Sequence, residues 1–103
     1  MTGYGFHPEA LSDLDEIWEF IGQHDIDAAD RVIGEILGSI ESLETFPDRG
    51  HERLDLAKSP IRFILVREYL IAYVPEEKPL WVLAVIHGRR RPHLMASVLR
   101  GRT

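Results

Sequence analysis

Arginine side chains offer the clearest chemistry in this sequence. Arg89, Arg90 and Arg91 directly follow the apolar run 80–87, and Arg62 lies inside a second apolar run. Guanidinium groups bind phosphates and carboxylates through paired hydrogen bonds. If the two runs form strands that lie side by side, Arg62 and one or two of the other arginines converge on one sheet face as an anion-binding cluster. The alternative is a set of solvated arginines that pair with the chain's many acidic residues.

Arg62 also raises a question of burial. Its neighbours Ile61 and Phe63 are apolar, and in a strand they face the side opposite to Arg62. An unpaired buried charge is costly. We therefore expect Arg62 to point toward an open sheet face or to have a partner within the chain.

The histidines suggest acid–base chemistry at one position and no metal site. His87 ends the apolar run, and His93 follows shortly after. Imidazole titrates near neutral pH, so His87 is a candidate acid or base; the alternative is a structural hydrogen bond to a neighbouring carbonyl. His7, His24 and His51 are scattered and the chain has no cysteine, so we expect no metal. No glycine-rich phosphate loop or nucleophile motif is present, and we expect no cofactor.

Charge is unevenly distributed along the chain. The net charge is −5, yet residues 1–48 contain twelve acidic residues and one basic residue, whereas residues 49–103 contain eleven basic and five acidic residues. Such an asymmetry is typical of a basic working surface beside an acidic scaffold. The alternative is that acidic helix faces are simply solvated and that the two halves mix in space. We expect Asp13, Glu16 and Glu19 to form such a solvated helix face and not a carboxylate dyad.

Length and composition indicate one globular domain over residues 1–103. The chain is 45% hydrophobic and 28% charged, which is ordinary for a globular protein. Its start has neither a basic region nor an apolar run, and no stretch approaches the roughly 18 apolar residues of a membrane span. We therefore expect a cytoplasmic protein without a membrane partner.

The period of the apolar residues predicts the elements that position these side chains. Strand-like and helix-like periods alternate along the chain, and Pro8 and Pro47 mark a helix start and a helix stop. We expect an α+β fold, in which a helical hairpin packs on one face of a mainly antiparallel sheet and the other face is open or only partly covered. The predicted order is a strand at 4–8, a helix from 9 to about 22, a helix from Asp25 or Asp27 to before Pro47, strands at 61–67, 69–74 and 80–87, and a possible short helix at 93–100.

Several motifs together resemble one known family. The matching stretches are "PEA" followed by "DLDEI", an alanine pair that opens the second helix, "SLETFPDRG", "IRFILVREYLIAYV" and "VLAVIHGRRRP". In this order and spacing they resemble ParE/RelE-superfamily toxins of bacterial type II toxin–antitoxin modules. The resemblance covers nearly the whole chain and is closer to the ParE branch, whose members are often labelled plasmid stabilisation proteins. It implies a RelE-like fold and an antitoxin partner, likewise a protein, encoded by the adjacent gene and bound as a hetero-oligomer.

The resemblance implies two different activities. RelE-like members cleave mRNA on the ribosome, and by position Arg62 and Arg89 match the phosphate-binding arginines of that family. If the chain is such an endoribonuclease, the catalytic candidates are Arg62, Arg89, His87 and His93. The loop 51–60 lacks a dense lysine cluster, however, and the C-terminal segment lacks the aromatic or histidine–tyrosine ending of many nuclease members, for which His93 is the nearest substitute.

ParE-like members inhibit DNA gyrase without recognised catalytic chemistry, and the acidic net charge fits this branch better, because ribosome binding depends on cations that contact phosphate. In that case Arg62, Arg89, Arg90 and Arg91 bind the target. A third hypothesis is a non-toxic member of the family that only binds a partner.

Overall fold

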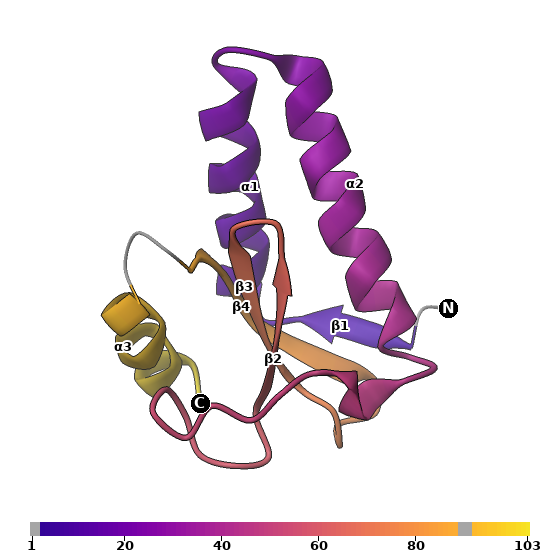
Figure 1. The fold of residues 1–103 in the computed structure, drawn as a ribbon, viewed down its shortest axis with the longest axis vertical. Helices are drawn as coiled ribbons and strands as arrows, with labels where there is room; N and C mark the ends of the chain where they lie inside the picture. The colour runs from indigo at the N-terminus through magenta and orange to yellow at the C-terminus, as the bar shows by residue number, and fades with distance from the viewer. Residues whose placement is uncertain (1–2, 89–91) are drawn as a thin grey trace.

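The chain folds as an α+β structure in the predicted order of elements (Figure 1). The computed structural model describes residues 3–88 and 92–103, without the side chains of residues 92 and 93. The elements of the described residues are β1 (Tyr4–Phe6), α1 (Pro8–Gly22), α2 (Ile26–Ser42), the short 3-10 helix η1 (Pro47–Arg49), β2 (Arg62–Val66), β3 (Tyr69–Val74), β4 (Leu80–His87) and α3 (Pro92–Arg102).

The sheet that these residues form is mixed, with strand order β1-β4-β3-β2. The pairs β2–β3 and β3–β4 are antiparallel, whereas β1 runs parallel to β4. β1 is shorter than predicted because Pro8 already occupies the first turn of α1. The predicted turn near Glu68 is present, and Arg67 adopts a φ of 56° there. The mainly antiparallel sheet is therefore confirmed, with a parallel strand at one edge.

β4 contains a bulge that decides which way its backbone faces. Its register against β3 shifts between Ala72, opposite Ala84, and Tyr73, opposite Val82. Leu83 is the additional residue, and it packs with Ala84 in the same apolar cluster although the two are consecutive. Such a bulge interrupts the ladder and leaves backbone groups that need other partners.

Each sheet face carries its own apolar core. On one face the helical hairpin buries Leu14, Ile36 and Ile40 against residues such as Ile71 and Tyr73. On the opposite face, Met95 and Leu99 of α3 pack against a second cluster that includes Phe63 and Leu83. Of the two predicted states of this face, open or only partly covered, the second is therefore confirmed: α3 covers part of it, and Leu65 remains 66% exposed there.

The hairpin begins and turns at defined polar contacts. The Nδ1 atom of His7 accepts a hydrogen bond from the Glu9 amide at 3.1 Å and caps α1. Asp25, one of the two predicted caps of α2, accepts a hydrogen bond from the Ala28 amide at 3.0 Å. The indole of Trp18 donates to Asp30 at 2.8 Å and joins the two helices. No helix in the described part of the chain combines the length and the apolar composition that crossing a membrane requires.

Two glycines in contrasting surroundings give a test of this packing. A Cβ atom at Gly34 meets no neighbour within 4 Å, whereas one at Gly50 lies 2.8 Å from the Phe63 carbonyl oxygen. We expect Gly34→Ala to raise the free energy of unfolding by about 1 kcal/mol through helix propensity. We expect Gly50→Ala to lower the free energy of unfolding by about 1–3 kcal/mol, because the Phe63 backbone would have to shift to make room for the methyl group. Urea denaturation of both variants measures the difference, and equal effects at the two positions would contradict the described packing around Gly50.

Candidate functional site

Arg62 is a structural cation at the start of β2. Its guanidinium donates from one nitrogen to the Gly50 carbonyl at 2.6 Å and to the Asp48 carbonyl at 3.3 Å. Its Nε atom lies 3.6 Å from a carboxylate oxygen of Asp48. Arg62 pairs across strands with Tyr73, which belongs to the core on the hairpin face. Of the two predicted alternatives, the partner within the chain is therefore confirmed, and the open face is wrong because the hairpin packs on the side of Arg62.

Tyr73 holds the same loop from the sheet. Its hydroxyl donates to the Pro47 carbonyl at 2.7 Å and accepts from the Gly50 amide at 2.9 Å. Burial raises the pKa of the phenol, so the hydroxyl keeps its proton and its donor role at neutral pH. Arg62 and Tyr73 together satisfy backbone groups of the loop that joins α2 to β2.

His87 lies at the other end of the sheet. Its Nε2 atom is 2.9 Å from a carboxylate oxygen of Glu68, and its ring packs edge-on against Tyr69. Through β3, Arg62 is level with Val82 of β4. His87 is the fifth residue after Val82, roughly 16 Å further along an extended strand. The expected convergence of Arg62 with the arginines that follow β4 required β2 and β4 to be neighbouring strands. β3 lies between them, so this condition is not met.

The other candidate side chains cannot be placed in this way. Arg89, Arg90 and Arg91, and the side chain of His93, lie outside the described part of the chain. Their predicted roles therefore stay predictions from the sequence. Nowhere in the described residues do three histidine or acidic side chains gather in a manner that would hold a metal ion.

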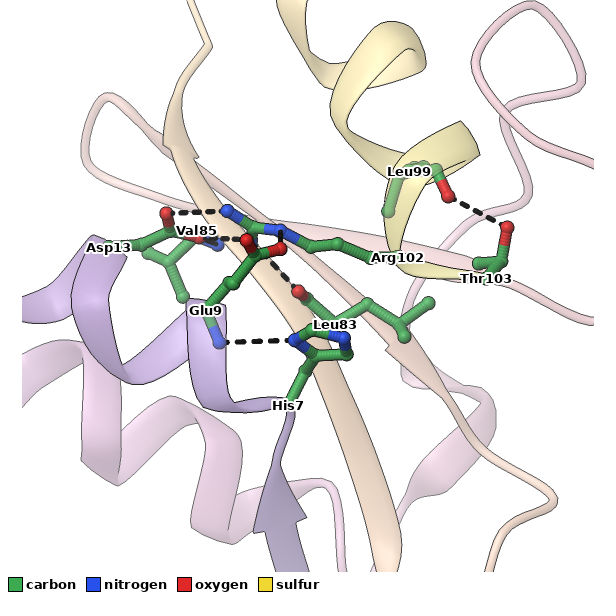
Figure 2. Close-up of polar contacts among 8 residues, drawn as sticks. All are labelled: His7, Glu9, Asp13, Leu83, Val85, Leu99, Arg102 and Thr103. Carbon is green, nitrogen blue, oxygen red and sulfur yellow. Dashed lines mark hydrogen bonds and ion pairs between the residues drawn. The ribbon is translucent and has the colours of Figure 1, made fainter.

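A polar network joins α1, β4 and the end of α3 (Figure 2). Arg102 donates to both carboxylate oxygens of Asp13, at 2.6 Å and 3.0 Å, and to one carboxylate oxygen of Glu9 at 3.2 Å. The side chains of Arg102 and Asp13 are only 10% and 11% exposed. These hydrogen bonds to Asp13 raise the pKa of the guanidinium above its ordinary value.

The same ion pair supplies partners for the bulged part of β4. Asp13 accepts a hydrogen bond from the Val85 amide at 3.0 Å, and Arg102 donates to the Leu83 carbonyl at 3.0 Å. The prediction that Asp13 belongs to a solvated helix face is wrong for this reason. One signal was available in the sequence: Asp13 is three residues after Ala10 and four before Ile17, so it lies at the edge of the apolar stripe of α1.

An apolar groove runs between α1 and α3, with β4 as its floor. We call it the α1–α3 groove; its volume is about 550 Å³. Ile17 and Phe20 line it from α1, and Leu94 and Val98 line it from α3, with Asp13 and Arg102 also among its lining residues. Phe20 is 53% exposed. Exposed apolar side chains gathered in a groove are typical of a surface that binds another chain.

Comparison with known families agrees with the resemblance seen in the sequence. Residues 4–92 match a family model described as the ParE toxin of the type II toxin–antitoxin system parDE. No curated protein matches the chain. The matched range includes the hairpin, the whole sheet and the segment that contains the three consecutive arginines.

The structural role of Arg62 predicts a loss of stability when it is removed. We expect Arg62→Ala to lower the free energy of unfolding by about 2 kcal/mol, because two carbonyls lose a charged donor. Arg53→Ala is the matched control: Arg53 forms a surface ion pair with Asp55, with both side chains largely exposed, and we expect a loss below about 1 kcal/mol. Chemical denaturation measures both, and an Arg62 variant as stable as the Arg53 variant would refute the anchoring role.

Proposed function

Because the chain belongs to the ParE toxin family of type II toxin–antitoxin systems, we propose that it inhibits DNA gyrase by binding to it. We further propose that an antitoxin encoded by the adjacent gene neutralises it in a hetero-oligomeric complex. Gyrase acts on chromosomal DNA, so this proposal places the action of the protein in the bacterial cytoplasm. The toxin class and an antitoxin partner follow from the family; the gyrase target, the neutralisation and the adjacent gene are the proposed parts.

One observation favours inhibition by binding over cleavage of RNA. A phosphoryl-transfer site needs a cation and an acid or base on the same reacting group. Arg62 instead donates to the Gly50 carbonyl, and His87 lies at the far end of the sheet beside Glu68. The two described candidates from the nuclease hypothesis therefore act on separate parts of the backbone and surface. A protein that only binds its target does not need them to converge.

The arginines at positions 89, 90 and 91 are the proposed contact with the target. They form the densest cationic segment of an otherwise acidic chain. Gyrase and its bound DNA both offer anionic groups, and complementary charge speeds association and fixes orientation. Arg62 and Arg102 are engaged with the chain's own backbone and carboxylates, so neither is assigned to this contact.

We expect the purified chain to inhibit the supercoiling reaction of DNA gyrase. The variant Arg89→Gln/Arg90→Gln/Arg91→Gln should inhibit at least roughly tenfold less well, because charged contacts at an interface are lost. The control Arg31→Gln/Lys58→Gln/Lys78→Gln removes the same charge at three exposed positions outside this segment and should inhibit as the parent does. Equal weakening by both variants would refute the site, since only net charge would then matter.

The same preparation distinguishes the other functions. If the parent does not inhibit supercoiling but cleaves mRNA on translating ribosomes, the gyrase proposal is wrong and the nuclease hypothesis replaces it. If it does neither, and cells that express it without a partner grow normally, the non-toxic binding member is the remaining hypothesis.

The α1–α3 groove provides a docking surface for the antitoxin. An amphipathic segment places its apolar side chains into such a groove. We expect Phe20→Ser to weaken the complex with the protein encoded by the adjacent gene by roughly tenfold, as an aromatic anchor does when truncated. Leu11→Ser is the control, because Leu11 is 50% exposed on α1 but does not line the groove. Titration calorimetry measures both, and an equal loss at both positions would place the antitoxin elsewhere.

A further inference from the structure

The helix α3 is held to the sheet by apolar contacts and to α1 by polar ones. The helix has eleven residues, a length at which isolated helices are marginal in water. Met95 and Leu99 are its buried apolar side chains in the described residues, whereas Leu94 is 37% exposed. The apolar contacts lie on the sheet side of the helix, against residues such as Phe63 and Leu83. They hold α3 over the sheet but define poorly how far it stands from α1.

Arg102 supplies the link between α3 and α1. Within the described residues, the hydrogen bonds and ion pairs that join these two helices all come from Arg102, to Asp13 and Glu9 (Figure 2). Leu94 and Phe20 line the same groove from the two helices, without a polar link between them. The ion pair therefore ties the two walls of the groove together at the last turn of α3.

The arrangement is one that defines position more than it adds stability. Desolvation offsets much of the attraction between two buried charges, so such pairs add little net stability while they require one geometry. Here each partner also has its own contact with the strand. Asp13 accepts a hydrogen bond from the Val85 amide, and Arg102 donates one to the Leu83 carbonyl. Both partners are therefore fixed against the backbone of β4. These contacts define a single position of α3 along the strand.

We infer that Arg102 is a positioning residue for target binding. It fixes the end of α3 against α1 and thereby the place of Pro92, where α3 begins. Pro92 directly follows the three arginines in the chain, so the same tie fixes one end of the proposed contact segment. This inference rests on the proposed function, since it assigns to Arg102 an effect on inhibition without contact to the target.

The test compares two arginines of one helix in the full chain. Arg102→Gln removes the tie, and Arg100→Gln is the matched control, because Arg100 is exposed and forms no ion pair among the described residues. Amide hydrogen exchange should accelerate by roughly tenfold in residues 95–102 of the Arg102 variant while α2 stays protected, since local opening exchanges independently of global unfolding. Inhibition of gyrase supercoiling should weaken by roughly fivefold or more, because preorganisation is lost.

A second variant covers the case in which Arg102→Gln leaves Asp13 as an unpaired buried charge and prevents folding. Asp13→Asn/Arg102→Gln removes both charges and retains neutral hydrogen-bonding groups. The double variant should fold, keep its exchange protection in α2, and still show faster exchange in α3 and weaker inhibition.

A charge-reversed pair tests the role of β4. Asp13→Arg/Arg102→Asp keeps the attraction between α1 and α3 but sets a cation against the Val85 amide and a carboxylate against the Leu83 carbonyl. We expect α3 to exchange as fast as in Arg102→Gln. Recovery of parental exchange would overturn the assigned role of the bulge.

The remaining outcomes separate this inference from the proposed function. If α3 loosens in the Arg102 variant but inhibition equals that of Arg100→Gln, the positioning role is wrong although the gyrase proposal stands. If the parent itself does not inhibit gyrase, the gyrase proposal fails, and with it the assigned effect on inhibition, while hydrogen exchange still decides whether Arg102 fastens α3. If hydrogen exchange in α3 is the same in Arg102→Gln and Arg100→Gln, the inference that Arg102 holds α3 in place is wrong.

Discussion

On the edge away from β3, the second half of β4 has no neighbouring strand and must obtain its hydrogen-bond partners in another way. The arrangement of the fold depends on how it does so. β1 pairs only with Leu80, Trp81 and Val82, because Pro8 begins α1 directly afterwards. The bulge at Leu83 then turns backbone groups toward α1. A helix has no free row of amides and carbonyls to offer, so side chains must supply the partners. Asp13 and Arg102 do so, and one contact thereby fixes both α1 and α3 against the sheet.

This contact also explains part of the uneven charge of the chain. Arg102 joins the basic second half to Asp13 and Glu9 of the acidic hairpin, and Arg67 joins the β2–β3 turn to Glu35 of α2 at 2.6 Å. Of the two interpretations of the charge asymmetry, mixing of the halves in space therefore holds for these pairs. This statement covers the described residues. The three consecutive arginines are a further basic segment, and the proposed contact with the target explains why they are basic.

The sequence predicted the elements well and the faces of the sheet poorly. The spacing of the apolar residues, together with Pro8 and Pro47 as helix boundaries, was sufficient to predict the order of the elements and nearly all of their bounds. This is so because local apolar patterns decide where helices and strands form. The side of the sheet on which Arg62 lies depends on which face receives the hairpin, and alternation along a strand cannot tell one face from the other. The parallel pairing of β1 and the bulge at Leu83 are likewise properties of the assembled sheet, not of any single segment.

The Asp13–Arg102 pair shows the same limit more sharply. Eighty-nine positions separate the two residues, so no local pattern links them, and an aspartate among glutamates on a helix looks like part of a solvated face.

What the assembled structure adds is a distinction between cations that build the fold and cations that remain for a partner. Arg62 and Arg102 belong to the first kind, because each donates to backbone carbonyls of its own chain. A catalytic toxin would have to withdraw such groups from the backbone to use them on a substrate, with a loss of stability. A toxin that acts by binding can keep them in place, and its specificity then depends on how accurately the fold positions the surface that remains.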